Sequence, residues 1–175
     1  MSEVLNAIKS RRSIRGFQPD PVSRELIDQV IEAGLYAPSG MGAQEVIIVA
    51  VTNKELRDKL ATANREIAGF PGEMDPFYGA PAVLIVLGNR NHATYLYDGS
   101  LALGNMLLAA HSLGLGGIWI HRAKEEFEQP EWKALLAELG IQGNYEGIGH
   151  LALGYAAAEL PEAAPRKENR VYYAE

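Results

Sequence analysis

Apolar residues recur along the chain at two different spacings, and these spacings indicate which segments form helices and which form strands. In residues 2–10 and 23–36, apolar side chains return every three or four positions, which is the period of one helical face. Residues 46–51 and 82–88 are short, continuous apolar runs rich in Val, Ile and Leu, and this favours buried strands. Thr52 and Glu55 have the spacing of a capping box, so Thr52 is expected to cap a third helix.

The second half of the chain contains an unusually apolar helical segment, residues 98–113. A helix that is apolar nearly all round is buried on all sides. In a chain of 175 residues, this indicates that a second subunit supplies part of the cover. Further elements are expected at residues 118–120 (a strand), from Pro130 to Gly140 (a helix) and at 147–155 (a last core strand).

Helices and strands interleave without regular βαβ units, and the sequence has neither an internal repeat nor a domain linker. We therefore expect one α+β domain over residues 1–175. Residues 69–81 hold three prolines and three glycines and are expected to be an irregular loop that could cover a site. Residues 156–175 are expected to be an extended tail, with a short strand at 170–173.

Composition limits the functions that this domain can have. The net charge of −6 and the pI near 5.3 give no general attraction to nucleic acid or to an anionic membrane. Any anionic ligand must therefore be held by a local basic cluster. The absence of cysteine excludes disulfides, thiolate nucleophiles, cysteine-ligated zinc and iron–sulfur clusters.

Targeting and metal signals are also missing from the sequence. The first residues lack the basic and apolar stretches of a signal peptide, and no apolar run approaches the roughly 20 residues that span a bilayer. We expect a soluble, cytoplasmic protein. No metal site is expected, because the four histidines lie far apart in the sequence and none forms an H-x-x-x-H pair.

Two basic clusters at opposite ends of this acidic chain are the clearest candidates for ligand binding. They consist of Arg11, Arg12 and Arg15 around Ser13, and of Arg166 with Lys167 in the tail. Arginine offers a phosphate a planar, two-pronged set of donors, and a neighbouring serine hydroxyl adds one more. Taken alone, each cluster is also compatible with ordinary surface charge.

Six segments, in this order, resemble the nitroreductase family. The resemblance covers nearly the whole chain. The segments are RRSIR (11–15), APSGMGAQ (37–44), YGAP (78–81), LGLGGIWI (113–120), LGY (153–155) and PRK (165–167).

The resemblance implies a homodimer with a central mixed, mostly antiparallel sheet flanked by helices, and FMN bound non-covalently at the subunit interface. It implies that the phosphate and ribityl chain of FMN are held by both basic clusters. The ring would be contacted by the loop at 37–44 of the other subunit, by the backbone at the end of LGLGGIWI, and by a polar side chain. The implied cofactor-binding residues are Arg11, Arg12, Ser13, Arg15, Pro38, Ser39, Gly40, Gln44, Asn64, Trp119, Ile120, His121, Arg166 and Lys167.

The implied activity is that of an NAD(P)H-dependent nitroreductase or quinone reductase. A hydride would pass from NADH or NADPH to the flavin, and then to a flat acceptor such as a nitroaromatic, a quinone or a flavin, in a ping-pong cycle. No side chain is expected to be an indispensable acid, base or nucleophile, and His121 is the nearest candidate. Two alternatives remain open: a different flavin enzyme on this scaffold, such as a reductive dehalogenase-like or flavin-consuming one, and a non-enzymatic FMN-binding protein.

Overall fold

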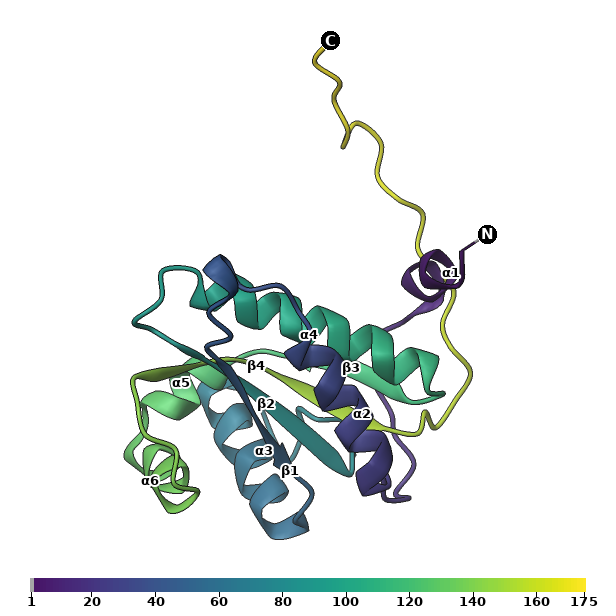
Figure 1. Ribbon diagram of the computed structural model, residues 1–175. Coiled ribbons are helices and arrows are strands. Elements are labelled where there is room, and N and C mark those ends of the chain that lie inside the picture. The colour runs from purple at the N-terminus through teal and green to yellow at the C-terminus, as the bar shows by residue number, and fades with distance from the viewer. Residues whose placement is uncertain (1) are drawn as a thin grey trace.

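The computed structural model describes residues 2–175 and contains a four-stranded antiparallel sheet covered by helices on both faces (Figure 1). The strands are β1 (Val46–Val51), β2 (Ala82–Asn89), β3 (Gly116–Ile120) and β4 (Tyr145–Gly154), in the order β1-β2-β4-β3. The helices are α1 (Glu3–Ser10), α2 (Arg24–Leu35), α3 (Lys54–Ala68), α4 (Tyr95–Ser112), α5 (Ala123–Glu128) and α6 (Pro130–Glu138), with a 3₁₀ turn, η1 (Gly40–Gly42).

Successive side chains of β2 point to opposite faces of the sheet, and this explains why helices cover both faces. Val83, Ile85 and Leu87 belong to a core that also contains residues of α3, α5 and α6, whereas Leu84 and Val86 belong to a core shared with α2 and α4. Successive side chains of a strand point to opposite faces, so an entirely apolar strand needs cover on both. The expectation that this run is a central strand is confirmed, because β2 lies between β1 and β4.

The fold class expected from the sequence is confirmed, with three local differences. The sheet was expected to be mixed, but every pair of its strands is antiparallel. The parallel pairing is limited to one isolated bridge, between Ser13 and Gly117. The capping prediction for α3 is wrong: Asn53, not Thr52, caps it, because its Oδ1 accepts the backbone N–H of Leu56 at 2.9 Å. The short helix α5 had no counterpart among the expected elements.

The C-terminal tail leaves the body beside α1 and runs away from it (Figure 1). The strand expected at residues 170–173 is wrong for the single chain, since these residues form no strand. Strands need a hydrogen-bonded neighbour, and the described part of the chain provides none for this segment. Val171, Tyr172 and Tyr173 are left exposed.

Candidate functional site

The segment that carries the first basic cluster runs along the outer edge of β3. Ser13 forms a bridge with Gly117, and the N–H of Ile14 donates to the Gly117 carbonyl at 3.3 Å. Backbone groups of every second residue in a strand point to the same edge, so those of Trp119 face outward like those of Gly117. Within residues 2–175, Trp119 has no strand partner on that side. Just beyond the basic cluster, β3 therefore offers an open edge of backbone donors and acceptors.

Arg11 supplies an unpaired donor at the start of this edge. Its Nη1 is buried and has no hydrogen-bond partner among the described residues. Next to it, Ser13 and the exposed Arg15 line a pocket of about 220 Å³ between the start of the chain and residues 157–161. A buried donor without an acceptor is unfavourable, and an anionic oxygen is its best partner. The chemistry of these donors fits a phosphate group.

Arg12 has a different set of partners from Arg11. Its guanidinium donates to three backbone carbonyls, those of Lys9 at 2.8 Å, Arg11 at 2.8 Å and Pro161 at 3.0 Å. It thereby ties the end of α1 to the beginning of the tail. Its contact with a cofactor stays a prediction.

The second basic cluster is not brought to the first within one chain. Arg166 and Lys167 are exposed in the tail, and the Arg166 guanidinium donates to the nearby carbonyl of Ala164. The role of this tail cluster in binding also stays a prediction.

The loop that contains Pro38, Ser39 and Gly40 is fixed by the start of α4. Asp98 accepts the N–H of Gly40 at 3.1 Å and the hydroxyl of Thr94 at 2.9 Å. A Cβ on Gly40 would lie 2.2 Å from the Thr94 hydroxyl oxygen, so glycine is required for this approach. The exposed Gln44 closes the loop, because its N–H donates to the Ser39 hydroxyl at 3.0 Å.

This loop and the basic cluster lie at opposite ends of α4. Thr94 and Asp98, at its start, hold the loop, whereas His111 in its last turn lies 2.7 Å from the Ser10 hydroxyl, next to the cluster. An α-helix of 18 residues is roughly 27 Å long. The single chain therefore does not bring these two sets of predicted cofactor ligands together.

At the far end of β3, a fully buried polar network holds two successive carbonyls. His150 Nδ1 lies 3.2 Å from the Ile120 carbonyl, and Asn64 Nδ2 donates to the His121 carbonyl at 2.9 Å. Glu126 joins the two, with 2.6 Å to Asn64 Nδ2 and 2.7 Å to His150 Nε2. A carbonyl only accepts, so we assign a proton to His150 Nδ1. The network fixes the backbone at the end of β3, whereas the His121 side chain is exposed.

Sequence reasoning missed Asp98, Glu126 and His150 as residues that shape the site. Asn64 and Glu126 are 62 positions apart, and His150 lies in a different strand again. No spacing along the chain indicates such a contact. A weaker signal was available for His150 alone, which interrupts the apolar stretch 147–155 that was expected to be a core strand.

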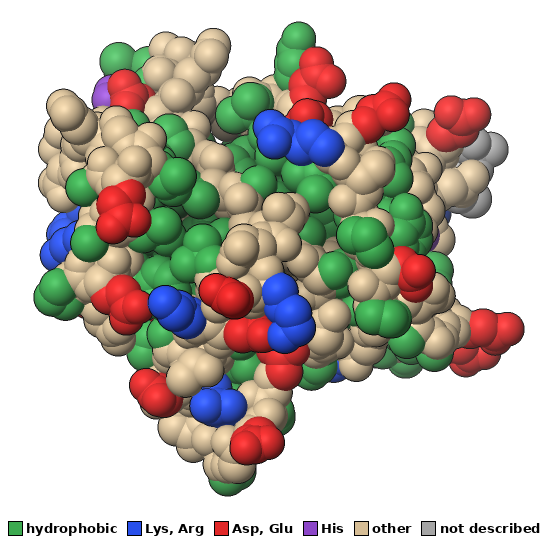
Figure 2. Space-filling model, turned by 90° about the horizontal axis from the view of Figure 1, so that it is seen from below, with side chains coloured by type: hydrophobic (Ala, Val, Ile, Leu, Met, Phe, Trp, Pro, Cys, Tyr) green, Lys and Arg blue, Asp and Glu red, His purple; other side chains and the backbone are tan. Residues whose placement is uncertain are grey.

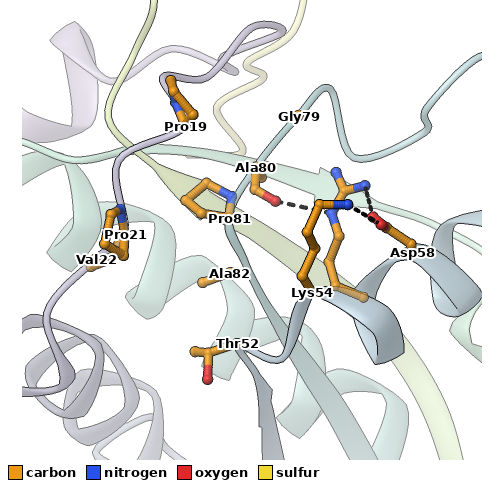
Figure 3. Close-up of a pocket in the computed structure, with 11 residues that line it drawn as sticks. Pro19, Pro21, Val22, Thr52, Lys54, Asp58, Gly79, Ala80, Pro81 and Ala82 are labelled. Atoms are coloured by element: carbon orange, nitrogen blue, oxygen red, sulfur yellow. Dashed lines mark hydrogen bonds and ion pairs between the residues drawn. The ribbon is translucent and has the colours of Figure 1, made fainter.

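A hollow of about 420 Å³ beside the start of α3 contains none of the predicted cofactor residues (Figure 3). Its walls are mainly apolar, and its basic groups are already paired: Lys54 with Asp58, and Arg57 with Asp58, Asp75 and the Ala80 carbonyl. The hydrogen bond from Lys54 holds the pKa of Asp58 below its ordinary value. Seen from below, the molecule carries charges of both signs among apolar side chains (Figure 2). Since Lys54 and Arg57 are both paired, the hollow that they line offers no free cationic donor to an anion.

Residues 2–175 contain neither a cluster of metal-binding side chains nor a helix that could span a membrane. No group of three or more His, Asp or Glu side chains is placed to hold a metal ion. No helix in this part of the chain combines the length and the apolar character needed to cross a membrane.

Comparison with known proteins gives a consistent result. Residues 8–155 match the model of the family described as "Nitroreductase family". A candidate NADH dehydrogenase/NAD(P)H nitroreductase from Methanothermobacter thermautotrophicus is 36% identical over 67% of this chain and 60% of its own length. An FMN reductase [NAD(P)H] from Bacillus subtilis is 31% identical over 67% of this chain and 53% of its own length. The chain therefore spans only about half to two thirds of these relatives.

Solved structures match over the full length. A nitroreductase with bound FMN from Bacteroides fragilis superposes with a TM-score of 0.88 at 31% identity, and all of both chains is covered.

Proposed function

The chain belongs to the nitroreductase family, and from this premise we propose that it is an FMN-dependent oxidoreductase. It transfers a hydride from NAD(P)H to flat electrophilic acceptors, namely nitroaromatics, quinones or flavins, by a ping-pong mechanism. The observation that carries the proposal is the buried, unpaired Nη1 of Arg11 at the start of the open β3 edge. The names of the relatives and the FMN in a solved structure of the same fold support it.

The phosphate end of the cofactor is assigned to the pocket beside Arg11. Ser13 and Arg15 line this pocket, and Arg11, with its unpaired Nη1, precedes them in the same segment, so the segment offers one neutral and two charged donors. In this proposal, the phosphate is also bound by Arg12, Arg166 and Lys167. The tail cluster then takes a different position from the one that it has in the single chain.

The ring end is assigned to the open edge at Trp119, Ile120 and His121, where outward backbone groups lie beyond the basic cluster. Asn64 acts at this end by fixing the His121 carbonyl. When bound, FMN supplies the centre that accepts and returns the hydride. The chain itself binds and orients, and it donates hydrogen bonds to developing negative charge. No side chain is assigned as a catalytic acid or base, and His121 remains the nearest candidate.

A homodimer completes the site in this proposal. The loop with Pro38, Ser39, Gly40 and Gln44 lies one length of α4 away from the basic cluster, so it reaches the cofactor only from a second copy. Large apolar side chains on α1 and α4 stand exposed in the single chain, with Val4 64% and Tyr97 68% accessible. Exposed apolar faces of this kind favour burial between subunits.

Anaerobic reduction tests the proposal. Protein purified and incubated with FMN is expected to hold about one flavin per chain and to bleach when NADH or NADPH is added without oxygen. A protein that binds no FMN contradicts the proposal. A protein that holds FMN but does not bleach has a binding role instead.

A further inference from the structure

Arg122 directly follows His121, between β3 and α5, and its side chain is held by two partners. Its Nε donates to Asn64 Oδ1 at 3.1 Å, and its guanidinium carbon lies 5.1 Å from the centre of the Phe70 ring. Its φ of 79° lies in the left-handed region, which long side chains rarely adopt. The surrounding structure therefore imposes this conformation.

Asn64 is itself fixed, which makes the Arg122 orientation specific. The amide is fully buried, and its Nδ2 is used by the His121 carbonyl and by Glu126. The amide therefore cannot flip without losing both bonds, and Oδ1 must face Arg122. With Nε bound and one face on Phe70, the guanidinium keeps its two Nη nitrogens for another partner.

No carboxylate neutralises Arg122 within residues 2–175, and its Nη nitrogens have no hydrogen bond to any residue there. By contrast, Arg24 pairs with Asp28, and Arg57 pairs with Asp58 and Asp75. In a chain with a net charge of −6, an unneutralised guanidinium is a local site of positive potential. A stacked guanidinium with both Nη groups available matches a carboxylate or phosphate through two parallel bonds.

We propose that Arg122 is a specificity-determining residue that binds an anionic group on the molecule exchanging hydride at this site. The group is a carboxylate on a flat acceptor or a phosphate of the nicotinamide donor. The inference rests on the proposed function, because that function puts the reactive edge of the site at residues 119–121.

The test compares two acceptors of nearly the same shape, the anionic 4-nitrobenzoate and the neutral 4-nitrobenzamide. The variants are Arg122→Gln, which removes the charge, Arg122→Lys, which keeps it, and Arg24→Gln as a matched control on the paired surface arginine of α2. Flavin content is measured first, so that only equally loaded proteins are compared.

For Arg122→Gln, we expect the ratio of kcat/KM for nitrobenzoate over nitrobenzamide to fall about tenfold to a hundredfold. The same ratio should fall less in Arg122→Lys, and Arg24→Gln should keep the wild-type ratio. If instead the acceptor ratio is unchanged and KM for NADH and NADPH rises by that factor, the anion is a phosphate of the donor. Unchanged acceptor ratios and donor KM values would overturn the inference.

A binding measurement without turnover separates this inference from the proposed function. Equilibrium dialysis of benzoate and benzamide against the oxidised, FMN-incubated protein should show a preference for benzoate that Arg122→Gln removes. Where the donor KM values have identified the anion as a phosphate of NAD(P)H, the same comparison is made with NADPH. If wild-type protein oxidises no NAD(P)H, the proposed function fails, and dialysis of benzoate and of NADPH decides the role of Arg122. Equal affinity of wild type and Arg122→Gln for both ligands then refutes that role.

Discussion

Neighbouring arginines at the start of the chain differ in what their side chains already contact. Arg12 is bonded to three carbonyls, whereas Arg11 keeps a buried nitrogen without an acceptor. A residue with an unmet bond gains more from a ligand than one whose bonds are made. The hydrogen-bond partners of each atom therefore distinguish Arg11 from Arg12, although the two are the same residue type at adjacent positions.

Arg11→Ala should therefore weaken FMN binding. Loss of a charge-assisted hydrogen bond costs about 1.5–3 kcal/mol, which corresponds to a roughly ten- to hundredfold higher Kd in fluorescence titrations with FMN. Arg12→Ala and Arg166→Ala test the remaining phosphate assignments in the same titration. Wild-type affinity in all three variants would show that the phosphate lies elsewhere.

Glu126→Ala should strongly destabilise the fold. Glu126 is fully buried and joins Asn64 to His150, so its removal leaves both without their shared partner. Breaking a buried pair costs about 3–5 kcal/mol, to be measured as a lower midpoint in urea unfolding. The control is Glu128→Ala, an exposed carboxylate on the same helix, for which we expect a change within about 0.5 kcal/mol. Equal effects of the two substitutions would refute the network.

Among the elements, α4 connects the separate parts of the proposed site. Its first turn holds the loop at Gly40 through Asp98, its last turn contacts Ser10, and its middle packs on the sheet through Leu103 and Met106. One rigid helix thus sets the spacing between the two groups of predicted ligands. Its start is fixed to β4 by Tyr95, whose hydroxyl donates to Glu146 at 2.9 Å.

Tyr95→Phe should lower stability in a pH-dependent way. The hydrogen bond to Glu146, followed by burial, raises the pKa of Tyr95 above its ordinary value of 10.0. A group with a raised folded-state pKa contributes stability that is complete below the ordinary value and is lost as the pH rises through the raised one. The difference in unfolding free energy, about 1 kcal/mol, should be constant from about pH 7 to 9 and shrink above pH 10.

Urea unfolding of wild type and Tyr95→Phe at several pH values measures this difference. The exposed Tyr36, which directly follows α2, gives the control Tyr36→Phe, which should show no such trend. A difference that persists undiminished at about pH 11 would contradict the assigned hydrogen bond.

For the molecule as a whole, the tail and the exposed apolar faces are the features that favour the proposed homodimer. Residues up to Pro161 contact the body, through the bridge of Ala156 to Phe17 and the bond of Arg12 to Pro161. Beyond them the chain makes only local contacts. The 14 residues after Pro161 can reach roughly 45–50 Å when extended, which is far enough to cover part of a neighbouring subunit.

A chain that ends at Glu162 should therefore lose its dimeric state while keeping its fold. We expect the full chain to elute as a dimer in size-exclusion chromatography with light scattering, and the shortened chain as a monomer or aggregate. This cut keeps the contacts of residues 156–161, so a loss of assembly cannot be attributed to them. A shortened chain that remains a flavin-loaded dimer would refute the role of the tail.

The sequence by itself determined the architecture and the family. Continuous apolar runs predicted the central strand β2 correctly, and helical periodicity predicted α2 with its cap at Ser23. These features depend on neighbours within a few positions, so a single chain carries them in its pattern. Even the cap of α3 was misplaced by only one residue.

Only the tertiary structure decided which polar side chains act together. Glu126, Asn64 and His150 come from three elements, and their contacts exist because α3 and α5 pack on the same face of the sheet. Likewise, the sequence grouped Arg11 with Arg12, whereas folding left a nitrogen of Arg11 unpaired and bonded Arg12 to backbone. Long-range packing determines both the buried network and the different partners of the two arginines. Buried polar groups have no water to bond to, so the contacts that they make within the protein decide their energy.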